Sequence, residues 1–81
     1  MQMVLIELVS NSPSTVEYRY YPESKENAPG SFKISKDDLE ETDVTRAPGD
    51  RFSIYLDHAI TEAAALVKSG CTKKESTACW Y

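Results

Sequence analysis

The sequence predicts an α+β fold in which an antiparallel four-stranded β-meander packs on one C-terminal helix, in the order ββββα. Four short segments alternate apolar and polar residues with the period of half-buried strands, and polar turns separate them. One later segment, residues 50–69, spaces its apolar residues with the period of a helix instead. The 81 residues are enough for one small hydrophobic core, so we expect a single domain over residues 1–81.

The predicted strands cover residues 3–9, 15–21, 31–35 and 42–47. The second is the clearest, because Tyr18 and Tyr20 alternate with Glu17 and Arg19. In the fourth strand, Val44 is the only strongly apolar residue expected to point inward. Short connections favour a sheet in which consecutive strands are neighbours.

The helix prediction depends on the angular distribution of apolar side chains. At about 100° per residue, these side chains cover an arc of roughly 140°. They are Phe52, Tyr55, Leu56, Ala59, Ile60, Ala63, Leu66 and Val67. Asp50 is the expected N-cap, because its carboxylate can accept hydrogen bonds from first-turn amides. Gly70 is expected to end the helix in the left-handed conformation.

The tail, residues 70–81, is polar until its last four residues. Ala78 to Tyr81 form a short edge strand or lie over the core; we expect packing over Met3, Leu5 and Val9. Trp80 and Tyr81 also suit a partner interface, where such aromatic residues are enriched.

Composition excludes several classes of function. The net charge of −4 and the pI near 4.8 argue against direct nucleic-acid binding, which requires basic charge. No apolar run reaches the length of about 18 residues that a membrane span needs. The apolar start lacks a positive region and a cleavage site, so a strand in a cytoplasmic protein is expected there.

No cofactor or metal site is expected. The two cysteines, Cys71 and Cys79, do not make a disulfide framework, and a cytoplasmic location favours free thiols. With His58 as the single histidine, the chain also lacks the ligands for a four-coordinate zinc site.

Two surfaces are candidates for protein binding. The first is the acidic segment, residues 37–43, which suits a basic partner or forms a solvated turn. Leu39 within it is a contact point or folds back onto the sheet. The second groups Tyr21 with the terminal aromatic residues. The complete set is Asp37, Asp38, Leu39, Glu40, Glu41, Asp43, Tyr21, Trp80 and Tyr81.

A weaker candidate for ligand binding lies on one helix edge and comprises Arg51, Tyr55, His58 and Glu62. In a functional interpretation, His58 is a general base oriented by Glu62 four residues later. In the alternative, His58 makes a local ion pair, and no catalytic residue is assigned. On the far side of the helix, Ile54 lies with two alanines and suits weak self-association, so a monomer or weak homodimer is expected.

Three motifs together resemble a group of small bacterial proteins, mostly from Firmicutes and their mobile elements, to which no activity is assigned. The motifs are a YxYxPE strand end within residues 15–24, a DxFxxYxxHA helix start from Asp50 to Ala59, and the terminal ACWY. This chain differs in its longer lysine-rich tail and in having Asp38-Leu39 where the group has a Thr-Gly-like turn. The resemblance implies a bacterial, cytoplasmic protein.

Together these features favour a non-catalytic protein–protein interaction module of the inhibitor, immunity or anti-defence type. The alternative is a small-ligand-binding protein or minor enzyme that uses His58 at the helix edge.

Overall fold

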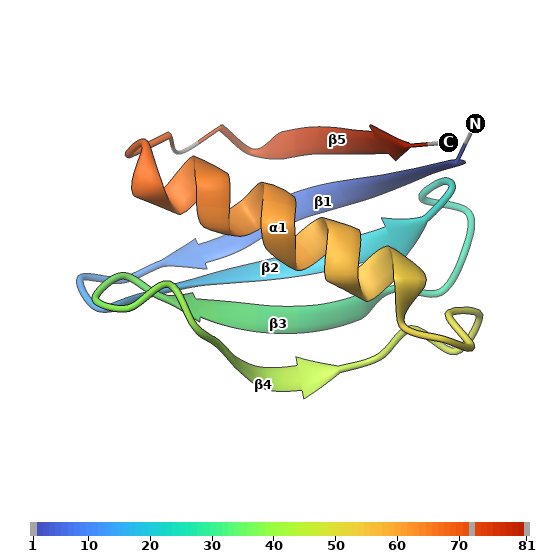
Figure 1. The fold of residues 1–81 in the computed structure, drawn as a ribbon, viewed down its shortest axis with the longest axis horizontal. Helices are drawn as coiled ribbons and strands as arrows, with labels where there is room; N and C mark the ends of the chain where they lie inside the picture. The colour runs from blue at the N-terminus through green and yellow to red at the C-terminus, as the bar shows by residue number, and fades with distance from the viewer. Residues whose placement is uncertain (1, 72, 81) are drawn as a thin grey trace.

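The computed structural model describes residues 2–71 and 73–80 and shows an α+β fold, a five-stranded antiparallel sheet with one helix on one face (Figure 1). The sheet order is β4-β3-β2-β1-β5. The elements are β1 (Gln2–Asn11), β2 (Thr15–Pro22), β3 (Gly30–Ser35), β4 (Glu41–Thr45), α1 (Ile54–Lys68) and β5 (Glu75–Trp80).

The first four strands follow one another across the sheet, as their short connections predict. The tail adds a fifth strand, which pairs with β1 from Gln2↔Trp80 to Glu7↔Glu75. The chain therefore crosses from the β4 edge to the opposite edge through α1 (Figure 1). Trp80 packs within the molecule, but on the helix side of the sheet and not over Met3, Leu5 and Val9.

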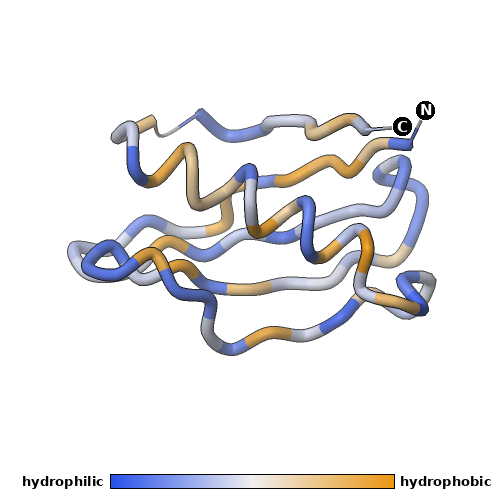
Figure 2. The backbone as a smooth tube through the Cα atoms, in the orientation of Figure 1, coloured by the Kyte–Doolittle hydropathy of each residue, from blue (hydrophilic) through white to orange (hydrophobic). Residues whose placement is uncertain are grey.

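The core lies between α1 and the inner face of the sheet. Burial alternates along β2 and β3, and this alternation places every second residue of both strands against the helix. In β3 the hydropathy alternates as well, from Phe32 through Lys33 to Ile34 (Figure 2). The largest fully buried side chains include Tyr18, Tyr20 and Phe32, whose rings pack together. From the helix, Leu56, Ala59 and Ala63 are buried, as the apolar arc predicts.

The predicted start of the helix is wrong. The helical period predicts that Phe52 faces the core, but Phe52 is 80% exposed, because α1 begins at Ile54 and not at Asp50. Residues 50–53 form a turn in which Ser53 takes a left-handed conformation with φ of 59°. Val44 also differs from the prediction: it is 43% exposed, because β4 is an edge strand whose residues all lie in solvent.

The helix ends as predicted. Gly70 has φ of 75°, and its N–H donates to the Val67 carbonyl at 3.1 Å. The Cys71 N–H donates to the Leu66 carbonyl at 2.9 Å, and together these bonds form a Schellman motif. This cap turns the chain back toward the sheet and fixes the position of Cys71 beneath the end of α1.

Candidate functional site

A buried carboxylate organises the N-terminal end of α1. Asp50 is 2% exposed, and its Oδ2 accepts from the Tyr20 hydroxyl and from the Leu56 N–H, both at 2.9 Å. Its Oδ1 accepts from the Tyr55 N–H at 3.2 Å. The carboxylate thus satisfies first-turn amides, as expected of an N-cap, although it lies outside the N-cap position.

Tyr20 connects this carboxylate to the loop before the helix. Its hydroxyl donates to Asp50 and accepts from the Ala47 N–H at 2.8 Å. Burial, together with the bond to Asp50, raises the pKa of Tyr20 to about 12. Gly30 makes room for this arrangement, because a Cβ there would lie 2.3 Å from a ring carbon of Tyr20. The loop is therefore held at several fixed points.

This pre-helix loop, residues 46–53, carries an exposed apolar and basic surface. Phe52 projects into solvent, and Ile54 at the start of α1 is 43% exposed. Arg46 and Arg51 are both exposed, and the Arg46 Nη1 donates to the Arg51 carbonyl at 3.3 Å. We call these four residues the Phe52 surface. The sequence indicates an exposed position for Ile54 but not for Phe52, because the helical period assigns Phe52 to the core.

The acidic segment lies at the other end of β4. Its acidic side chains are exposed, and the Asp43 carboxylate forms an ion pair with Lys33 at 3.2 Å. Leu39 has φ of 61° and folds back against the core, so it is only partly exposed. This segment borders the β4 edge, whereas Trp80 lies in β5 at the opposite edge. The two sets of predicted protein-binding residues are therefore on different sides of the molecule, and Tyr81 lies outside the described residues.

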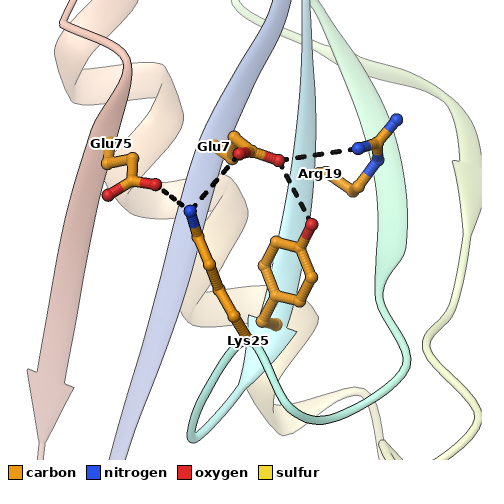
Figure 3. A network of polar contacts seen from close by, with 5 residues as sticks. Glu7, Arg19, Lys25 and Glu75 are labelled. Atoms are coloured by element: carbon orange, nitrogen blue, oxygen red, sulfur yellow. Dashed lines mark hydrogen bonds and ion pairs between the residues drawn. The ribbon is translucent and has the colours of Figure 1, made fainter.

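Tyr21 lies on the outer face of the sheet within a polar network (Figure 3). Its hydroxyl donates to Glu7 Oε1 at 3.1 Å, and Arg19 approaches the same oxygen at 3.6 Å. Lys25 contacts the carboxylates of both Glu7 and Glu75, and its hydrogen bond to Glu75 raises the pKa of Lys25. Since these two glutamates are directly opposite across β1 and β5, Lys25 offsets a repulsion between like charges.

The helix edge that faces β5 is a packing surface. The His58 ring stacks on Trp80 with 3.8 Å between ring centroids, and Tyr55 meets the same indole edge-on at 5.5 Å. The Glu62 carboxylate accepts from the buried Ser76 hydroxyl at 2.7 Å. Within the described chain, no hydrogen bond or ion pair joins His58 to Glu62. Arg51 lies apart, in the pre-helix loop.

Concave sites open on the surface near each end of α1. One, of about 250 Å³, lies beside Tyr55, whose hydroxyl donates to Glu23 at 2.7 Å, a bond that raises the pKa of Tyr55. Its described lining does not include His58 or Glu62. The other, of about 180 Å³, lies under the C-terminal end of α1. Its described lining is Leu8, Asn11, Val16, Tyr18, Lys36, Val67, Gly70 and Cys71.

Both cysteines are free thiols, Cys71 half-buried and Cys79 exposed. Across residues 2–71 and 73–80, no three histidine, cysteine or acidic side chains are grouped as metal ligands, and no helix could span a membrane. Comparison of the chain with protein families, with curated proteins and with solved structures found no match.

Proposed function

We propose that this protein is a non-catalytic protein-binding module of the small inhibitor or immunity type, and that the Phe52 surface is its main contact. The observation that carries the proposal is the exposure of Phe52, 80% of whose surface lies in solvent. A phenylalanine side chain gains roughly 1.5–3 kcal/mol when it is buried. A partner that encloses the ring therefore gains free energy that the folded chain itself does not use.

The pre-helix loop presents Phe52 in a fixed position. Asp50, two residues earlier, is buried and accepts three hydrogen bonds, and Ala47 is held by the Tyr20 hydroxyl. A contact residue on an anchored loop loses less conformational entropy when a partner binds. The loop is thus suited to binding in the conformation that the structure shows.

Charge indicates the kind of partner. Arg46 and Arg51 flank Phe52 in a chain of net charge −4, and arginine is enriched at interface hot spots. The acidic segment lies along the same sheet edge, at the far end of β4 (Figure 1). We expect a partner with an apolar pocket rimmed by acidic groups for Phe52 and with basic groups toward the acidic segment.

Photo-crosslinking in bacterial cells tests the proposal. A benzophenone amino acid placed at position 52 should give one discrete adduct with a partner. The same amino acid at Val9, an exposed apolar residue in β1, serves as the control and should give none. Equal adducts at both positions, or none at position 52, would contradict the proposal.

Binding measurements with the purified partner follow. Phe52→Ala should weaken binding at least tenfold and leave the free energy of unfolding within about 0.5 kcal/mol, as for exposed residues generally. Val9→Ala should change neither quantity. Unchanged affinity in Phe52→Ala would remove Phe52 from the interface.

A further inference from the structure

Tyr18 is a buried residue whose hydroxyl forms no hydrogen bond with another described residue. The residue is 2% exposed, yet its hydroxyl makes no hydrogen bond to any part of residues 2–71 and 73–80. Over the same residues, every fully enclosed side-chain nitrogen or oxygen does have a partner. Tyr18 lines the 180 Å³ cavity under α1, next to Cys71 and Lys36.

The walls of this cavity are mainly apolar. Leu8 and Val16 come from the sheet, and Val67 comes from the last turn of α1. An apolar cavity of about 150 Å³ is large enough to hold benzene. A cavity of about 180 Å³ therefore accommodates a single ring, or a short chain, with a small polar group attached.

The polar residues that line the cavity indicate which polar group a ligand would carry. Tyr18 supplies a hydroxyl donor, Asn11 an amide, and Lys36 the only charged side chain among the described lining residues. No carboxylate is among these residues, so an anionic ligand meets no like charge there. Burial and the nearby Cys71 thiol raise the pKa of Tyr18, so its phenol keeps its proton and acts as a donor at neutral pH.

We propose that this cavity, which we name the Tyr18 site, binds a small carboxylate with one ring or a short chain. Its apolar part lies among Leu8, Val16 and Val67, and its carboxylate accepts from the Tyr18 hydroxyl beside Lys36. The site is independent of the Phe52 surface, which lies at the other end of α1, so either proposal can fail without the other.

The two cysteines provide the test, because Cys71 lines the cavity and Cys79 lies exposed on β5. Trypsin cleaves after Lys68, Lys73 and Lys74, so the two thiols fall in separate peptides. The rate of alkylation by iodoacetamide is measured for each peptide by mass spectrometry, with benzoate as the probe. Benzyl alcohol is the neutral comparison, and acetate controls for ionic strength.

Benzoate at millimolar concentration should slow alkylation of Cys71 at least threefold and leave that of Cys79 unchanged. Benzyl alcohol should protect Cys71 less than benzoate does, and acetate should not protect it. Absence of protection by benzoate would overturn the site, and equal protection by benzyl alcohol would overturn its preference for a carboxylate.

Two variants separate the roles of the polar groups. Tyr18→Phe keeps the ring but removes the donor, and Lys36→Gln removes the charge, so each should reduce protection by benzoate. Tyr21→Phe, on the outer face, is the matched control and should leave that protection unchanged. Full protection by benzoate in Tyr18→Phe would also overturn the proposal. Because Tyr18→Phe removes no hydrogen bond within the described chain, it is expected to fold.

Discussion

Tyr18 and Tyr20 lie two residues apart on the same face of β2, and both are buried, yet their hydroxyls meet opposite conditions. At the N-terminal end of α1, the Tyr20 hydroxyl both donates and accepts, and the space around it is closed. Toward the C-terminal end, Tyr18 lines a cavity, and its hydroxyl forms no hydrogen bond with another described residue. One end of the helix is thus fixed by polar contacts, and the other keeps a donor available for a ligand.

Removal of the Asp50 carboxylate, at the N-terminal end of α1, should have the largest effect on the free energy of unfolding. Asp50→Ala leaves the amides of Tyr55 and Leu56 and the Tyr20 hydroxyl without their acceptor. Unsatisfied buried groups cost about 1–3 kcal/mol each, so we expect the free energy of unfolding to fall by about 3–5 kcal/mol. Urea denaturation measures this loss.

Asp57→Ala is the control for that substitution, because Asp57 is also acidic and near the helix start but is exposed. It should cost less than about 1 kcal/mol, the usual effect of a charge on the helix dipole. Equal losses in the two variants would show that the Asp50 hydrogen bonds are not what stabilises this end.

A larger residue at position 30, near the N-terminal end of α1, should destabilise the fold. A Cβ at Gly30 would lie 2.5 Å from the Thr45 carbonyl oxygen and 2.6 Å from the Ala47 nitrogen, both backbone atoms. Gly30→Ala should therefore cost about 3 kcal/mol, the upper end for overpacking. Thermal and urea denaturation both measure this cost.

Two substitutions that also add volume serve as controls for Gly30→Ala. Gly49→Ala adds a Cβ that meets no atom within 4 Å and should be neutral or slightly stabilising. Val67→Leu adds a methylene group beside the Tyr18 site and should change stability by less than about 0.5 kcal/mol. A loss in Val67→Leu comparable to that in Gly30→Ala would mean that the two ends are packed equally tightly.

Alkaline pH should lower the free energy of unfolding mainly through Tyr20, at the N-terminal end of α1. The folded chain holds the Tyr20 proton up to about pH 12, whereas an unfolded tyrosine releases it near the ordinary pKa of 10.0. Between these values the unfolded state binds fewer protons, so the free energy of unfolding falls by about 1.4 kcal/mol per pH unit. Below pH 10 this contribution is fully present.

Urea denaturation from pH 8 to pH 11.5 measures the decline. Tyr20→Phe should reduce the dependence of the free energy of unfolding on pH more than Tyr18→Phe does, although burial also raises the pKa of Tyr18. The same slope in the original chain and in Tyr20→Phe would assign the alkaline loss to other groups.

The smallest of these effects compares the two hydroxyls directly at neutral pH. Tyr20→Phe leaves the Ala47 N–H unpaired and should cost about 2 kcal/mol, whereas Tyr18→Phe should change stability by less than about 0.5 kcal/mol. Chemical denaturation of both variants gives the difference. Should Tyr18→Phe be as costly as Tyr20→Phe, its hydroxyl would have a structural partner and the cavity would lose its donor.

The strands were predictable because their burial follows a local period of two. The tail was harder, since Ser76 points inward as a polar residue and is satisfied only by Glu62 on the helix. The local pattern places the start of α1 too early, because Asp50 is drawn into the core by Tyr20, which lies 30 residues away in sequence. Local patterns do not contain such long-range pairings.

The candidate sites depend on the same kind of contact. Tyr18 and Tyr20 both point to the inner face of β2, and the alternation along that strand does not tell which of the two hydroxyls has a hydrogen-bond partner. The Phe52 surface arises only because the helix starts at Ile54. Both sites therefore became visible only when distant segments were placed together.

The pairing of β5 with β1 also sets an order of events in folding. The turns that join β1, β2 and β3 close over short stretches, whereas Gln2↔Trp80 joins residues almost a full chain length apart. We expect the meander to form first and β5 to join it after the rate-limiting step. Ser76→Ala should then speed unfolding and leave refolding nearly unchanged. Trp80, stacked on His58, gives a fluorescence signal for stopped-flow measurements, and slower refolding would place β5 in the nucleus.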